Sequence, residues 1–67
     1  MSEELAETIY AIDFNDNLLE FNKKGAKEAT TVKQRLLYRK NIRKIKHTLK
    51  VLRLYRLSLE QHTSVQP

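Results

Sequence analysis

The chain has 67 residues, with 13 Lys and Arg, 8 Asp and Glu, and no cysteine. A chain of this length forms one domain at most, and without cysteine it has neither a disulfide framework nor a thiolate metal site. It contains no run of 18 apolar residues, and its acidic N-terminus lacks the layout of a signal or transit peptide. We therefore expect a soluble, non-secreted protein that does not span a membrane.

Charge is distributed unevenly along the chain. Residues 1–22 contain six acidic and no basic residues, whereas residues 23–67 contain thirteen basic and two acidic residues, a formal charge of +11. Such asymmetry is typical of a protein that binds a polyanion, either nucleic acid or an anionic membrane surface. The alternative is that two helices neutralise each other across an antiparallel contact, but the acidic half carries too little charge to offset the basic half.

The first predicted element is a helix over about residues 2–24. Ser2 is a suitable N-cap, and Glu3 and Glu4 follow in the first turn, where the helix dipole favours anions. Apolar residues lie on two roughly opposite faces, with Leu5, Ile9, Ile12 and Leu19 on one and Tyr10, Phe14, Leu18 and Phe21 on the other. Either two surfaces cover this helix or it breaks near residues 13–17, and we favour one helix with an irregularity there.

A turn is expected over about residues 25–30. This segment contains Gly25, the only glycine of the chain, and glycine is the residue best able to end a helix in the left-handed conformation. Two helices joined by a short loop pack antiparallel.

The second helix is expected over about residues 31–60. Thr31 and Gln34 fit the capping-box pattern at its start, and neither glycine nor proline interrupts the segment. A narrow helix–helix seam, spaced alternately by four and three residues, is formed by Tyr38, Ile42, Ile45, Leu49 and Leu52. A frayed tail is expected from Thr63. The sequence thus predicts an all-α fold, one long antiparallel two-helix hairpin over residues 1–67.

No motif for catalysis or cofactor binding is present. His47 and His62 have no Cys partner and no metal-binding motif around them, and a single glycine cannot supply a phosphate-binding loop. The carboxylates lack the apolar pocket that would raise the pKa of one of them and make an acid–base pair. We therefore expect no enzyme activity, no metal, no cofactor and no small-molecule substrate.

The basic residues of the second helix follow a helical pattern of their own. A basic stripe beside the seam, at spacings of 4, 4, 3, 4 and 3, is formed by Arg35, Arg39, Arg43, Lys46, Lys50 and Arg53. Arginine binds phosphate oxygens in bidentate fashion and lysine adds point charges, so the stripe is suited to a nucleic-acid backbone. Residues 33–56 contain no acidic residue, whereas a merely solvated face would normally interleave acids. We expect the RNA-binding residues to be Arg35, Arg39, Lys40, Arg43, Lys44, Lys46, Lys50 and Arg53.

Residues 38–49 resemble the second-helix signature of the large-subunit ribosomal protein L twenty-nine family. The residues that match this signature in kind and spacing are Arg39, Lys40, Ile42, Lys44, Ile45, Lys46 and Leu49. Residues 2–5 and 18–22 are similar to the start and end of the family's first helix, whereas Asn41 and Arg43 stand where aspartate and alanine are usual.

The resemblance implies a long helical hairpin that is a structural constituent of the ribosome. It further implies that the second helix holds large-subunit rRNA near the polypeptide exit tunnel, beside a neighbouring protein of the L twenty-three type. The corresponding ribosome would be that of a bacterial cytoplasm or of an organelle, either plastid or mitochondrion.

Three other interpretations remain open. Leu54-Tyr55-Arg56 resembles the short motif of the mitochondrial LYR assembly-factor family and indicates a protein–protein adaptor, although that motif normally lies near the N-terminus. The alternating seam also suits a homodimeric coiled-coil scaffold that binds no RNA. A basic amphipathic helix on a membrane surface is disfavoured, because the seam is narrow and carries neither Trp nor Phe.

Overall fold

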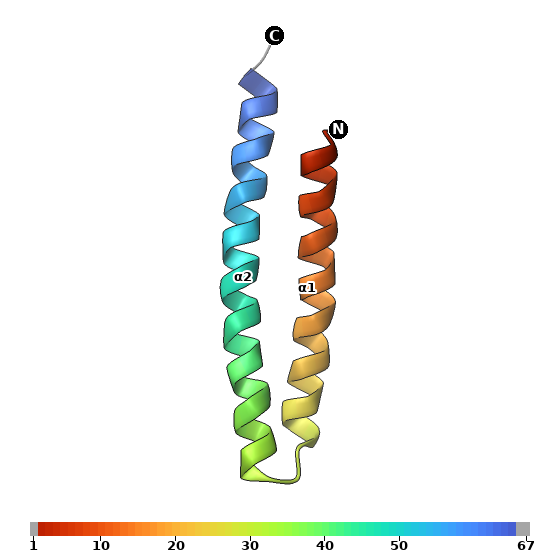
Figure 1. The fold of residues 1–67 in the computed structure, drawn as a ribbon, viewed down its shortest axis with the longest axis vertical. Coiled ribbons are helices and arrows are strands. Elements are labelled where there is room, and N and C mark those ends of the chain that lie inside the picture. The colour runs from red at the N-terminus through yellow and green to blue at the C-terminus, as the bar shows by residue number, and fades with distance from the viewer. Residues whose placement is uncertain (1, 66–67) are drawn as a thin grey trace.

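The computed structural model describes residues 2–65 of the chain and the side chains of residues 2–61. Two helices, α1 (Glu3–Glu28) and α2 (Val32–Val65), run antiparallel and are joined by residues 29–31, so that the start of α1 and the end of α2 lie toward the same end of the hairpin (Figure 1). The hairpin is a flattened rod of 56 × 15 × 12 Å. The predicted all-α antiparallel hairpin is therefore confirmed. Neither described helix contains a segment long and apolar enough to cross a membrane.

Both helices begin at a side-chain cap. The Ser2 hydroxyl accepts a hydrogen bond from the Leu5 amide at 3.1 Å, and the Thr31 hydroxyl accepts one from the Gln34 amide at the same distance. Each cap satisfies one of the amides that a helix start leaves without a backbone partner. The Gln34 side chain does not complete the reciprocal half of the capping box, because its oxygen accepts from the Thr30 hydroxyl at 3.5 Å instead.

The first helix is longer and more regular than the sequence indicates. α1 continues without a break through residues 13–17 and ends at Glu28 rather than near residue 24. Within that segment, the Asn15 side chain donates a hydrogen bond to the Ala11 carbonyl at 2.8 Å, which satisfies its amide without interrupting the helix. The turn is confined to residues 29–31, so the expected turn over 25–30 was placed too early.

Gly25 does not end α1, because it lies three residues inside the helix and no described residue has a positive φ. The reason for a glycine here is the close approach of the other helix. A Cβ at this position would lie less than 3.0 Å from three carbon atoms of the Tyr38 ring. Gly25 therefore gives room to an aromatic side chain of α2 rather than making a left-handed turn.

The C-terminal end of α2 also extends beyond the predicted limit near residue 60. The helix includes residues 63–65, which belong to the segment where a frayed tail is expected. The rest of that tail, residues 66 and 67, lies outside the described residues.

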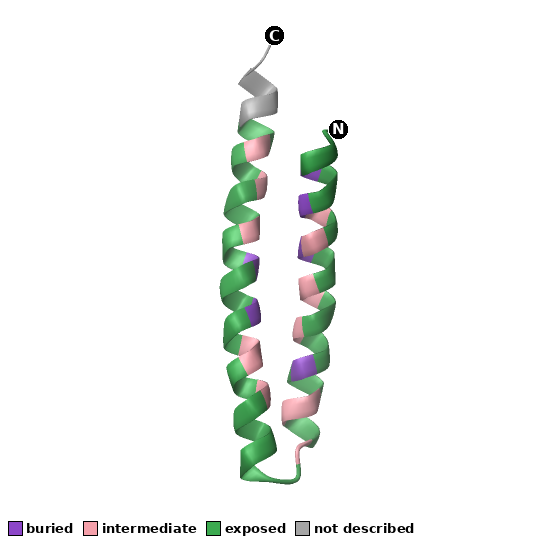
Figure 2. Cartoon of the chain, viewed as in Figure 1, coloured by how far each residue is buried: buried purple, intermediate pink, exposed green. Residues whose placement is uncertain are grey.

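The core lies between the two helices, where buried and half-buried residues line the facing sides (Figure 2). Of the seam of α2, Leu49 is only 2% exposed and Ile45 is buried, and both pack with Ile12 of α1. The flanking seam residues Tyr38, Ile42 and Leu52 are half-buried. The seam residues therefore all face α1, with the tightest packing at the middle of the rod.

The facing side of α1 alternates an apolar row with a polar row. The polar row consists of Thr8, Asn15 and Asn22, which lie seven residues apart. The side chain of each donates a hydrogen bond to the backbone carbonyl oxygen four residues earlier in the helix. Asn22 is 5% exposed, and its side-chain oxygen also accepts a hydrogen bond from Asn41 of α2 at 3.2 Å. Polar side chains that are hydrogen-bonded within α1 thus form one of the two rows that face α2, which the apolar pattern alone does not predict.

The second apolar face of α1 remains uncovered by the chain itself. Tyr10, Phe14 and Phe21 are each more than half exposed, and Leu18 is 37% exposed. Of the two interpretations of this helix, a break is wrong, and the surface that would cover the second face is not supplied by α2.

The close approach of Gly25 and Tyr38 leads to a testable prediction. A glycine-to-alanine change inside a helix normally stabilises it by about 1 kcal/mol. We expect Gly25→Ala to lower the free energy of unfolding instead, because displacing a packed ring costs roughly 1–3 kcal/mol. In a Tyr38→Ala background the same change should recover the usual gain of about 1 kcal/mol. Urea unfolding followed by circular dichroism measures both, and equal effects in the two backgrounds would contradict the close-approach role.

Candidate nucleic-acid interface

Two contacts between the helices distinguish the two broad sides of the hairpin. On one side, the Arg53 guanidinium lies 3.2 Å from the Asp16 carboxylate. On the other side, the Tyr55 hydroxyl donates a hydrogen bond to the Glu4 carboxylate. We call the first side the charged face and the second the apolar face. The helices pack along a seven-residue repeat. A residue seven positions before or after one of these four therefore lies on the same side of the hairpin as that residue.

The charged face gathers the basic stripe. Residues 39 and 46 share the flank of Arg53, and residues 43 and 50 lie next to them on the outward side. Arg35 lies at the loop end of the same side. The structure therefore brings six of the eight predicted residues to one face. It separates the other two, because helical spacing places Lys40 on the outer edge of α2 and Lys44 on the apolar face.

Most of the stripe has no acidic partner. Arg53 is held by Asp16, but both side chains are about half exposed, so the pair stabilises the fold by less than about 1 kcal/mol. The other ion pairs of the described residues are Lys23–Glu20 and Arg56–Glu60. Five cations remain without an ion pair to any described residue, over roughly 22 Å of helix; they are Arg35, Arg39, Arg43, Lys46 and Lys50.

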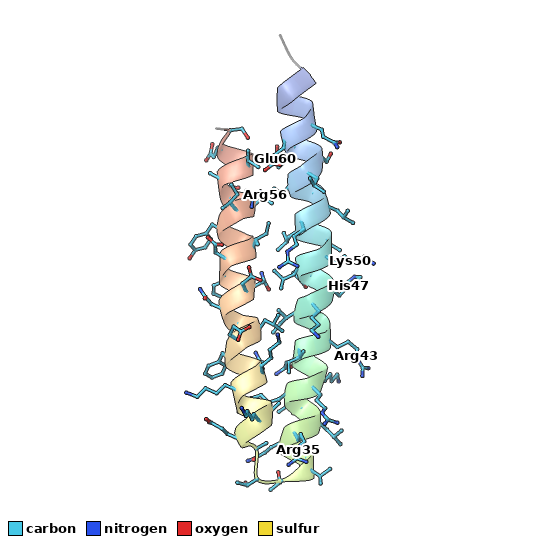
Figure 3. All side chains as sticks on the ribbon, turned by 180° about the vertical axis from the view of Figure 1, so that it is seen from behind. Arg35, Arg43, His47, Lys50, Arg56 and Glu60 are labelled. Atoms are coloured by element: carbon cyan, nitrogen blue, oxygen red, sulfur yellow. The ribbon has the colours of Figure 1, made fainter. Side chains whose placement is uncertain are left out.

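The outer edge of α2 adds a histidine to this surface. Arg43, His47 and Lys50 project together from the side of α2 that points away from α1 (Figure 3). His47 is exposed and has no hydrogen-bond partner among the described residues. It was not among the predicted binding residues, although its spacing of three and four residues from Lys50 and Arg43 places it on their row.

Charge is also separated along the rod. Residues 20–46 form the loop end and contain ten Lys and Arg against two Glu, a formal charge of +8, whereas the remaining residues carry −3. The loop end includes Lys23, Lys24 and Lys27 of α1, which the antiparallel fold brings level with the start of α2. The basic pattern of the sequence predicts a site on the second helix alone. That these lysines add to the charge of the loop end follows only from the position of the turn.

The described side chains of this face offer hydrogen-bond donors but no metal-binding cluster. Among the side chains of residues 2–61, no group of three or more His, Asp or Glu could hold a metal ion. The side chains of the tripeptide Leu54-Tyr55-Arg56 do not form a free motif, because Tyr55 bonds to Glu4 and Arg56 to Glu60. Exposed guanidinium and ammonium groups in one row, by contrast, are donors that match phosphate oxygens.

The chain matches no family model, and neither a curated protein nor a solved structure shows significant similarity to it. What the protein does must therefore be argued from its own residues.

The hydrogen bond from Tyr55 to Glu4 raises the pKa of the Tyr55 hydroxyl, because the bond is lost when the phenol ionises. Desolvation and the charge of Glu4 act in the same direction.

This raised pKa predicts a pH dependence of stability. A group whose pKa is higher in the folded state stabilises the fold below its unfolded pKa, about 10 for tyrosine, and loses that contribution as the pH rises through the folded value. We expect the native chain to be more stable than Tyr55→Phe at neutral pH, and the difference to shrink in alkaline solution. Urea unfolding of both proteins at a series of pH values measures this, and a difference that stays constant would contradict it.

Proposed function

We propose that the protein is a non-catalytic RNA-binding protein, a structural constituent of the large ribosomal subunit, and that its charged face follows the phosphates of folded rRNA. The observation that carries the proposal is the row of five exposed cations without acidic partners on one face of α2. Because four of these five cations lie within the strongly basic loop end, the field that attracts a polyanion is concentrated there.

The energetics favour an anionic partner. Like charges four residues apart on a helix destabilise it by about 0.2–0.5 kcal/mol per pair. The stripe contains several such pairs, for example Arg35 with Arg39 and Arg39 with Arg43. Phosphate groups along the row would attract the cations and so offset these repulsions, and binding would release counterions from the RNA.

The side chains of the charged face favour folded RNA over single strands. Proteins that bind single strands stack bases on aromatic side chains, whereas double-stranded RNA is recognised through its backbone and shape. All five aromatic residues of the chain are described, and by helical position none lies on the charged face. Binding should therefore be strongly salt-dependent and largely independent of sequence.

The proposed ribosomal role is supported by the resemblance of residues 38–49 to the L twenty-nine family. The long hairpin with a basic second helix is consistent with that resemblance. We place the protein on large-subunit rRNA near the polypeptide exit tunnel, next to a protein of the L twenty-three type, in a bacterial or organellar ribosome. Sedimentation of the native protein with large subunits on a sucrose gradient, and its release by high salt, would support this. A position at the top of the gradient would contradict it.

Neutralising the charged face should remove RNA binding. We expect Arg39→Gln, Arg43→Gln, Lys46→Gln and Lys50→Gln together to lower the slope of log K against log salt by about 3, at roughly 0.7–0.9 per lost contact. Helix content should stay unchanged, because all four side chains are exposed. Fluorescence anisotropy with a short RNA duplex over a range of salt concentrations measures the slope.

The matched control removes four charges from other faces: Lys24, Lys33, Lys40 and Lys44. This variant has the same net charge as the first but keeps the row intact, so its slope should fall by less than half as much. Equal losses in the two variants would show that net charge, and not the charged face, determines binding.

Releasing Arg53 should have the opposite effect. Asp16→Asn removes the carboxylate that holds Arg53, so the stripe gains a sixth free cation and the salt slope should rise by about one contact. Asp13→Asn changes the net charge equally but breaks no ion pair of the described residues, and serves as the control. If both variants raise the RNA affinity by the same factor, Arg53 does not contact the RNA.

A further inference from the structure

The apolar face of the hairpin is almost free of charge. Between residues 11–25 of α1 and residues 37–58 of α2, the positions on this side carry a single formal charge, that of Lys44. Large apolar side chains, each between 37% and 68% exposed, are contributed by Phe14, Leu18, Phe21, Leu37, Val51 and Tyr55. They come from both helices and lie on the side marked by the Tyr55–Glu4 hydrogen bond. A contiguous apolar surface of this kind indicates an interaction site rather than scattered exposed leucines.

The hairpin alone has a very small core. The buried apolar residues of the described chain are Leu5, Ile12, Ile45 and Leu49, and the polar row of α1 occupies much of the remaining contact surface. Domains of this size are marginally stable, and those with small cores commonly depend on oligomerisation. Helical hairpins close a complete core when four helices pack as a bundle. More apolar side chains are exposed on the apolar face than are buried between the helices.

We propose that the apolar face binds the apolar face of a second copy of this chain, forming an antiparallel four-helix bundle with the two loop ends at opposite ends. The size of the face fits this occupant. A surface of 56 × 15 Å presents roughly the 800 Å² that each partner contributes to an interface of standard size. Its apolar centre is bordered at the open end by Glu4 and Glu7, in agreement with the usual polar rim.

The charges of the hairpin favour a second copy of the chain over a polyanion on the apolar face, and the antiparallel over the parallel orientation of the two copies. A polyanion is disfavoured on this face, because it carries one lysine and is bordered by carboxylates. Between two copies, the antiparallel orientation places the +8 loop end of one beside the −3 end of the other, whereas the parallel orientation would place two +8 ends together. The dimer leaves both charged faces on its outer surfaces. It therefore neither requires nor prevents the proposed RNA binding.

Sedimentation equilibrium of the full chain, without RNA, tests the dimer. We expect twice the monomer mass for the native chain. Phe14→Glu with Val51→Glu should raise the dimer dissociation constant at least a hundredfold. Tyr10→Glu with Leu54→Glu is the matched control, because these side chains are also exposed but lie on the outer edges of the helices. The control should stay dimeric. A monomeric native chain, or equal dissociation of the two variants, overturns the proposal.

A second measurement does not depend on the folding of a charge-bearing variant. The chain has no cysteine, so single cysteines introduced as Thr30→Cys at the loop end and Glu7→Cys at the open end of the apolar face can each carry a pyrene label. In the antiparallel dimer, excimer fluorescence should arise when the two labelled proteins are mixed and not from labelled Thr30→Cys alone. Excimer emission from Thr30→Cys alone would show adjacent loop ends and overturn the orientation.

Discussion

The contact between α1 and α2 follows a repeat of seven residues, and this repeat fixes the direction of the other side chains in the hairpin. Apolar residues alone set the register weakly, because sliding one helix by seven residues would match apolar positions again. Two specific pairs remove this freedom. Sliding one helix by seven residues would break the hydrogen bond between Asn22 and Asn41. It would also place a residue with a Cβ atom against the ring of Tyr38, which now packs on Gly25.

Once the register is fixed, the two flanks of the seam acquire different chemistry. Arg53 and Tyr55 are two residues apart in α2, yet one meets Asp16 and the other meets Glu4 on opposite sides of α1. The same geometry carries the basic stripe to one broad face and the exposed apolar residues to the other. The turn at residues 29–31 then separates charge along the rod, because the acidic start of α1 lies far from the basic loop end.

Local signals in the sequence predict the elements well, and signals that depend on a partner residue predict them poorly. The caps at Ser2 and Thr31 need only their own neighbours, so both helix starts were predictable. The role of Gly25 depends on Tyr38, thirteen residues later, and the glycine was therefore mistaken for a helix end. For the candidate site, periodicity identified the stripe, but only the fold shows that Lys44 leaves it and that lysines of α1 join the loop end.

The distribution of acids also bears on whether the two helices merely neutralise each other. Among the described residues, Arg53–Asp16 is the single ion pair that joins α1 to α2. It lies farther from the loop than the five unpaired cations of the stripe. The acidic residues near the start of α1 lie opposite the C-terminal part of α2, which contains few basic residues. Folding thus preserves the charge asymmetry of the chain. A dimer built on the apolar face would carry a formal charge of +10 with both charged faces outward, so it would present a polyanion with two rows of cations that act together.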